Sequence, residues 1–292
     1  VDFWIERFKL KLLDFYPNMK FKKHSFKLIT CLEVPCSYDF KGKGLFRTLG
    51  GFLRDVLRLD VYRIYRRVLV LLNLLKDPLD NYHEWININK KNKLETIVFF
   101  LMADFSRYDR NLSFYSKIFK EKIKDISDFC EVSLLSSFSS IENKKIIKNE
   151  KKRLESVVKM NIIKVRQNLI KVDIPITYRN FASLGFKEDY SLQYYNFPGF
   201  RASTSYPFYF FDLENEMETK LLINPVCITD RVLKIYKKPI VARQIIEEIT
   251  KYVKQINGKM IIVLNNSIIS DYSDNFKWKK MFNRFFNSHG KI

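Results

Sequence analysis

The sequence predicts an α/β protein built on a parallel sheet or barrel, with a helical insertion after the first strand. Three observations predict this class. Short apolar runs alternate with longer helical patterns, the runs are bounded by polar segments, and one Arg-rich helical stretch interrupts the alternation. Strands that alternate with helices are typical of a parallel sheet or barrel whose strands are buried.

The predicted strands are short runs of β-branched and aromatic residues. They cover residues 26–31, 96–102, 129–135, 162–165, 221–229 and 259–264. The helical patterns between and after them cover residues 82–91, 114–126, 143–159, 240–256 and 274–286. The clearest is 240–256, because Pro239 suits the first turn of a helix and Gly258 lies just past its end.

Residues 45–75 depart from the alternation, since they are helical in pattern throughout with a break near Gly50–Gly51. Six arginines lie in this segment. We interpret it as a helical insertion after the first barrel strand, where the loops of a barrel carry function. Two readings stay open: the basic face meets an anionic partner, or the segment is an amphipathic hairpin packed on the barrel, which is the commoner case.

Composition excludes several classes of protein. Of the 292 residues, 47% are hydrophobic and 15% aromatic, which excludes intrinsic disorder. Four cysteines without C-x-x-C spacing favour neither a disulfide framework nor a zinc ribbon, and three histidines leave little material for a metal site. The sequence contains no G-x-S-x-G elbow, no phosphate-binding loop and no G-x-G-x-x-G motif.

The net charge of +20 results from 52 basic and 32 acidic residues. A balance of this size favours polyanions or anionic surfaces. The lysines are scattered, however, so we interpret most of this charge as solvated surface and predict no specific nucleic-acid partner. The longest apolar runs are far shorter than a membrane span and no signal peptide is visible, which predicts no transmembrane segment and a cytoplasmic protein. No oligomeric state follows from the sequence.

Eight blocks carry a resemblance to a known family. They are TCLEVPCSYDFKGKG (30–44), FRTLGGFLRD (46–55), KDPLDNYHEW (76–85), CEVSLLSSFSS (130–140), VRQNLIKV (165–172), ITYRNFASLGFKEDYSLQY (176–194), GFRASTSYPFYFFDL (199–213) and INPVCITD (223–230). In this order the blocks resemble a branch of the polysaccharide deacetylase family found in Bacteroidetes-type bacteria. Family members usually carry a further N-terminal region. We therefore expect residues 1–23 to be the end of an upstream region, and residues 24–292 to be the barrel with its insertion at about 45–75.

The resemblance implies a distorted (β/α) barrel of the polysaccharide deacetylase type. It also implies hydrolysis of an acetamide or ester on a glycan by a divalent metal such as zinc. In that chemistry Asp and His ligands hold the metal, a carboxylate takes the proton of a metal-bound water, and a histidine protonates the leaving group. These groups lie at the carboxyl ends of barrel strands.

The positions that match those motifs are substituted here. The family's Asp and His positions carry other residues in this chain, namely Leu32, Val34, Leu135, Asn168 and Asn265. Other residues at matching positions are kept and are the candidate ligand-binding set, namely Arg166, Gln167, Arg201, Asp230 and Asn266. We predict no catalytic residue, no metal ligand and no cofactor. We also expect Leu32 and Val34 to face the site and Glu33 to point away from it, because neighbouring side chains on a strand alternate.

These substitutions predict a catalytically inactive, deacetylase-like protein that binds a polysaccharide or other glycan in its old cleft. Tyr194, Tyr195, Tyr206 and Phe208 are candidates for stacking on sugar rings, although aromatic residues are mostly core. Three alternatives stay open: an active N- or O-deacetylase with an atypical metal site, a basic scaffold for anionic partners, and a decaying gene without function.

Overall fold

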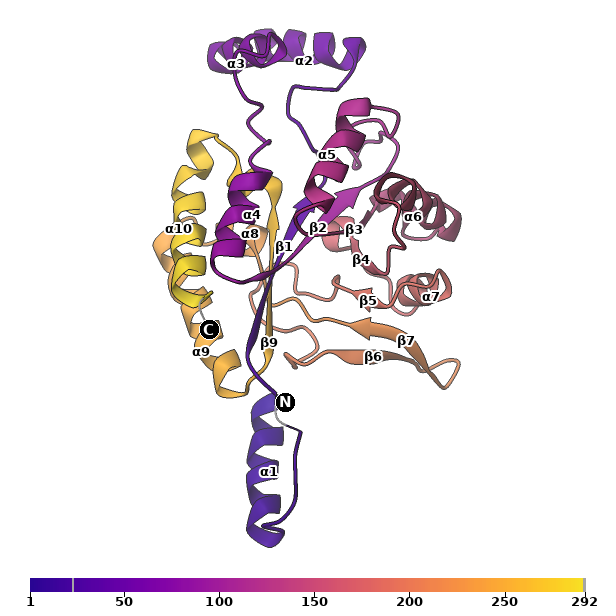
Figure 1. Cartoon of the computed structure of the whole chain (residues 1–292), viewed down its shortest axis with the longest axis vertical. Coiled ribbons are helices and arrows are strands. Elements are labelled where there is room, and N and C mark those ends of the chain that lie inside the picture. Colours follow the sequence, from indigo (N-terminus) through magenta and orange to yellow (C-terminus); the bar gives the residue numbers. More distant parts are fainter. Residues whose placement is uncertain (23, 291–292) are drawn as a thin grey trace.

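The computed structural model describes residues 1–22 and 24–290, which fold around one nine-stranded sheet (Figure 1). The strand order is β6-β7-β5-β4-β3-β2-β1-β9-β8, and every neighbouring pair is parallel except β6 and β7. The strands are β1 (Lys27–Val34), β2 (Glu95–Leu101), β3 (Glu131–Ser136), β4 (Lys164–Gln167), β5 (Glu188–Asp189), β6 (Phe208–Asp212), β7 (Met217–Ile223), β8 (Ile228–Thr229) and β9 (Lys259–Asn265). The ladder of the described residues ends at β6 and β8, so the barrel is open between these two strands.

Helices cover the outer face of this sheet and extend from both ends of the molecule (Figure 1). The α-helices are α1 (Asp2–Phe15), α2 (Leu45–Leu57), α3 (Val61–Leu71), α4 (Tyr82–Lys91), α5 (Lys117–Ser127), α6 (Lys144–Val158), α7 (Ile176–Ser183), α8 (Asp230–Lys234), α9 (Pro239–Gln255) and α10 (Ser273–His289). Helix α1 lies at one end of the long axis, and α2 and α3 lie at the other. No helix in the described ranges has the length and apolar character that crossing a membrane requires.

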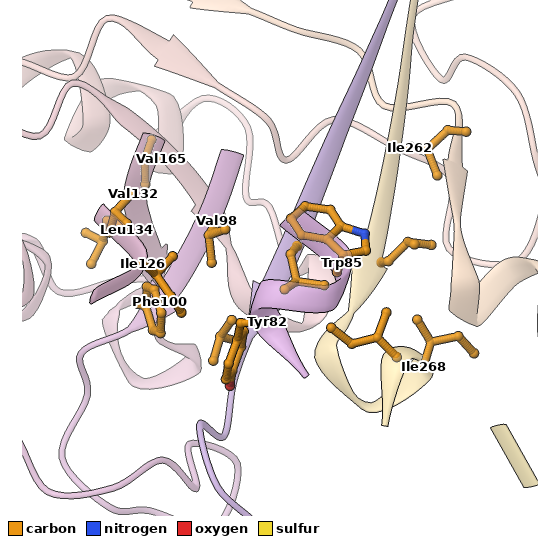
Figure 2. Close-up of a cluster of buried hydrophobic side chains, with 14 of the residues drawn as sticks. Tyr82, Trp85, Val98, Phe100, Ile126, Val132, Leu134, Val165, Ile262 and Ile268 are labelled. Atoms are coloured by element: carbon orange, nitrogen blue, oxygen red, sulfur yellow. The ribbon is translucent and has the colours of Figure 1, made fainter. Parts of the chain in front are cut away.

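The central strands of the sheet are buried on both faces, which explains why their runs are apolar throughout. Between the sheet and its helices lies the larger core, where Phe100 of β2 packs against the rings of Tyr82 and Phe119 (Figure 2). Inside the curved sheet lies a second apolar cluster that includes Ile29, Phe99 and Ile261. Each central strand therefore places alternate residues in two different cores.

The predicted strands and helices are confirmed in position to within a few residues, with two exceptions. The run at 221–229 is not one strand, because it contains the end of β7 and, after a loop, the short strand β8. The insertion does not break at Gly50–Gly51, since α2 continues through both glycines and ends at Leu57. A Cβ at Gly51 would lie 2.7 Å from the Arg67 guanidinium, so the glycine allows α3 to approach α2 closely.

The predicted boundary at residue 23 lies outside the described residues. Before it, α1 is tied to the barrel through Asp2, whose buried carboxylate accepts hydrogen bonds from the Ser205 amide at 2.7 Å and the Ser205 hydroxyl at 2.9 Å. The division into an upstream region and a barrel stays a prediction.

We expect Phe100→Ala to destabilise the fold strongly, because it empties a fully buried position between two other rings. Loss of a buried phenylalanine side chain costs about 3–5 kcal/mol of unfolding free energy. Chemical denaturation measures this cost, and Phe276→Ala, at a ring that is 64% exposed on α10, is the matched control. Equal denaturation midpoints for the two variants would contradict this description of the core.

Candidate functional site

A polar cleft lies at the carboxyl ends of β1, β4, β8 and β9, where barrels of this type carry their sites. Its volume is about 360 Å³. Strand ends and the loops after them supply its lining residues, which are Glu33, Pro35, Tyr108, Arg166, Asn168, Leu169, Thr229, Asp230, Arg231, Lys234, Asn265 and Ser267. Four of the predicted residues therefore meet here, namely Arg166, Asn168, Asp230 and Asn265.

An ion pair between Glu33 and Arg166 occupies the floor of the cleft. Arg166 donates from Nε to Glu33 Oε1 at 2.5 Å and from Nη2 to Gln193 Oε1 at 2.8 Å, and its Nη1 donates to the Tyr190 carbonyl. The Arg166 side chain is only 1% exposed, against 17% for Glu33. The guanidinium is thus a buried cation whose charge is compensated by Glu33.

The prediction that Leu32 and Val34 face the site is wrong. Both side chains are fully buried in the core beneath the helices, and Glu33 between them points into the cleft. The side chains of β1 do alternate, but the prediction assigned them to the wrong faces. A shift of one residue moves every side chain of a strand to the other face. The acidic residue of β1 lies on the cleft side because the helix side offers only apolar neighbours.

Asn168 lies in the cleft but is held by a carboxylate that the sequence analysis did not single out. Its Nδ2 donates to Asp109 Oδ1 at 3.2 Å. Asp109 is fully buried and also accepts from the Phe138 amide at 2.9 Å and from the amide and hydroxyl of Ser139 at 3.2 and 2.9 Å. This carboxylate is saturated by protein donors and fastens the loops after β2, β3 and β4 to one another.

Asp230 begins helix α8 and is 6% exposed. Its Oδ1 accepts a hydrogen bond from the Asn265 amide at 2.8 Å, which joins the ends of β8 and β9. Burial raises the pKa of Asp230 to about 6, and the nearby Glu33 charge adds to the effect. The carboxyl group of Asp230 therefore changes its charge near pH 6.

The other predicted residues do not reach the cleft. Leu135 is fully buried in the cluster inside the sheet. Gln167 points to the opposite side of β4 from Arg166 and donates to the Ser137 carbonyl at 2.7 Å. Asn266 donates to the Cys36 carbonyl at 2.8 Å, while Arg201 lies exposed in a turn. These positions fix loops or lie on the surface.

The carboxylates around the cleft do not fit a divalent metal. Within the ranges 1–22 and 24–290, no three side chains of His, Cys, Asp or Glu lie close enough together to hold an ion. Glu33, Asp109 and Asp230 each accept hydrogen bonds from other protein groups. A bound metal needs several protein ligands that converge on one point, and the described carboxylates do not form such a set.

Most of the polar groups that the sequence analysis missed come from two regions, and Ser267 lies in a third, after β9. Tyr108 and Asp109 lie in the loop after β2, which matched no motif. Thr229, Arg231 and Lys234 surround Asp230 at the start of α8 and lie within two helical turns of it. A search for charged residues beside each predicted strand end would have found the second group, since loops at that edge carry the site.

The predicted sugar-stacking residues lie outside the cleft lining. Tyr206 belongs to a different hollow, beside His24 near the start of β1. Tyr195 lies at the rim, where the Arg231 guanidinium stacks over its ring at 3.9 Å. The aromatic ring that lines the cleft is Tyr108, which is 50% exposed and packs against Phe138 at a centroid distance of 4.4 Å.

Comparison with known proteins identifies the fold. The sequence matches no profile of a known protein family, and no curated protein sequence matches it. Among solved structures, a candidate polysaccharide deacetylase from Mycobacterium smegmatis has a TM-score of 0.54 at 12% identity, covering 92% of this chain and 86% of its own. A second candidate polysaccharide deacetylase, from Pseudomonas aeruginosa, has a TM-score of 0.56 at 11% identity, covering 91% and 85%.

An allantoinase, PuuE, is similar to the same extent, with a TM-score of 0.54 at 9% identity over 92% of this chain and 86% of its own. These likenesses confirm the predicted fold, an α/β barrel of the polysaccharide deacetylase type. The Bacteroidetes branch stays a prediction. Since the allantoinase shares the fold, the fold alone does not select one reaction.

We expect the stability contributed by Asp230 to depend on pH. Its pKa rises on folding from 3.8 to about 6, so the folded protein binds the proton more tightly than the unfolded chain does. That stability is fully present below the unfolded value and is lost as the pH rises through about 6. The Asp230→Asn side chain cannot titrate and does not lose this stability. The difference between the unfolding free energies of the variant and the wild type should therefore change in favour of the variant, by up to about 3 kcal/mol, as the pH rises from about 4 to 7.

Denaturation at several pH values measures this difference. Asp274→Asn is the control, because Asp274 also lies in the first turn of a helix but is exposed. A pH profile of Asp230→Asn that runs parallel to the wild-type profile would show that Asp230 is not a buried titrating group.

Proposed function

We propose that this chain binds a glycan in the cleft at the carboxyl ends of its strands and does not catalyse metal-dependent deacetylation. The observation that carries the proposal is the Glu33–Arg166 ion pair, which fills the floor of the cleft with a compensated charge. A hydrolase of this chemistry needs a Lewis acid to polarise the carbonyl and a carboxylate whose lone pairs are available to a water. Among the described residues no three potential ligands lie together to hold a Lewis acid, and the Glu33 carboxylate is held in an ion pair with Arg166.

The cleft retains what sugar recognition uses. Hydroxyl groups of a glycan both donate and accept hydrogen bonds, and the lining supplies Asn265, Thr229 and Ser267 together with the charged Arg231 and Lys234. Tyr108 adds a half-exposed aromatic face. One ring beside several polar groups is a typical arrangement for a small polar ligand that presents an apolar face.

The proposal includes a cytoplasmic location and an upstream region that precedes residue 24. All four cysteines are free thiols, as is usual where the surroundings are reducing. We propose no nucleic-acid partner for the cleft, because only Arg166, Arg231 and Lys234 among its lining residues are cationic and Arg166 is already paired.

The test measures binding of chito-oligosaccharides, both acetylated and de-acetylated, by titration calorimetry. Tyr108→Ala should weaken binding about fivefold, since a stacked ring contributes on the order of 1 kcal/mol. Tyr115→Ala, at a tyrosine that is 80% exposed outside the cleft lining, is the matched control and should bind like the wild type. Binding that both variants weaken equally, or no binding of either sugar form, contradicts the proposed site.

Acetate release from the acetylated sugar separates this proposal from an active deacetylase. The wild type should release none in the presence of zinc, cobalt or nickel. Turnover that a chelator abolishes would establish the alternative of an atypical metal site.

A further inference from the structure

Helices α2 and α3 expose an apolar surface that no part of the described chain covers. Sixteen large apolar side chains between residues 45 and 75 are exposed, which is about half of that segment. The exposed fractions reach 90% for Phe46, 76% for Leu57, 84% for Leu59 and 73% for Val61. Monomeric soluble proteins rarely expose a contiguous patch of this kind unless it binds something. The expected hairpin therefore exists, but its apolar side is not packed on the barrel.

Several arginines of the same helices contact the barrel on the opposite side. Arg47 donates to the Asn111 carbonyl at 3.0 Å, and Arg66 donates to the Asp271 carbonyl at 3.1 Å. Arg67 is buried between the two helices, where it pairs with Asp55 at 2.5 Å. The helix pair thus has an outer apolar side and an inner basic side. Figure 1 shows both helices lying crosswise at the far end of the molecule, beyond the strands.

A basic cleft of about 650 Å³ opens beneath α2, between this helix and the loop after β2. Cationic side chains dominate its lining, namely Lys43, Arg47, Arg54, Arg63, Arg107 and Arg110. The Arg63 guanidinium is partly neutralised by Asp39 at 3.0 Å. Across residues 45–75 there are six arginines but only two aspartates. The inner side of the helix pair, opposite its apolar side, is therefore strongly positive.

We propose that α2 and α3 form a peripheral membrane-binding element whose occupant is an anionic phospholipid surface. The apolar side enters the boundary between headgroups and acyl chains, and the arginines around the basic cleft contact lipid phosphates. In-plane amphipathic helices bind in this way, with an apolar face in the bilayer and basic residues at the headgroups. At 13 and 11 residues, both helices are shorter than the roughly 20 residues that a membrane-spanning helix needs.

Charge decides between a membrane and a second copy of this chain. Each copy carries a net charge of +20, so pairing two copies through this end of the molecule brings like charges together. An anionic leaflet attracts the same surface, at about 1 kcal/mol for each basic residue near the headgroups. This inference is independent of the glycan site, because the two clefts share no lining residue.

Vesicle flotation with the full chain tests the proposal. We expect the wild type to float with phosphatidylcholine vesicles in which about one lipid in three is phosphatidylglycerol, to remain in solution with phosphatidylcholine alone, and to be released by high salt. The double variant F46S/L53S should bind at least about tenfold more weakly, since it removes two exposed apolar side chains. The matched control is L213S/M217S, which removes two exposed apolar side chains in the β6–β7 hairpin and should float like the wild type.

Three results overturn the proposal. The first is a wild type that stays in solution with the anionic vesicles at low salt. The second is an equal loss of flotation in both double variants. The third is a wild-type dimer in light scattering that F46S/L53S converts to a monomer, which would make the surface an interface between copies. All four substituted side chains are exposed, so we expect both variants to fold. Circular dichroism checks this.

Discussion

The buried guanidinium of Arg166 is the constraint on which the cleft depends. A cation that is 1% exposed has lost its hydration and requires acceptors in fixed positions. Those acceptors come from three places in the chain: Glu33 at the end of β1, the Tyr190 carbonyl just after β5, and Gln193 beyond it. One side chain of β4 thereby ties together the strand ends on both sides of the cleft.

This ion pair also determines what the cleft can do. Glu33 is the acidic side chain of β1 that faces the cleft, and it is committed to Arg166. Asp109 is committed to loop amides and Asp230 to the amide of Asn265. Each carboxylate is therefore part of the scaffold that shapes the cleft. The proposed recognition of hydroxyl groups uses this polar lining, whereas metal-assisted hydrolysis needs a set of ligands that hold an ion together.

Much of the fold follows from the sequence because strands that are buried on both faces are apolar throughout, and helices between them have a clear period. Because these strands are apolar on both faces, their sequence does not show which residues face the helices and which face the interior of the barrel. In β1 the residues on both sides of Glu33 are apolar, so alternation alone did not show that Glu33 faces the cleft. Asp109 was missed for a different reason: its partners are backbone amides of Phe138 and Ser139, about thirty residues away.

The insertion shows a further limit of pattern analysis. Its amphipathic period predicts two helices with an apolar side, and the structure contains them. The period carries no information about which side meets the barrel. Only the contacts of Arg47, Arg66 and Arg67 show that the basic side is turned inward and the apolar side outward.

The metal content of the purified protein tests the central claim most directly. The protein is incubated with zinc, cobalt and nickel, desalted and analysed by mass spectrometry for bound metal. The account predicts far less than one metal per chain, because no three potential ligands lie together in the part of the chain that the structure describes. About one metal per chain that remains after desalting would contradict it, and loss of that metal in a Glu33→Gln variant would place the ion in this cleft.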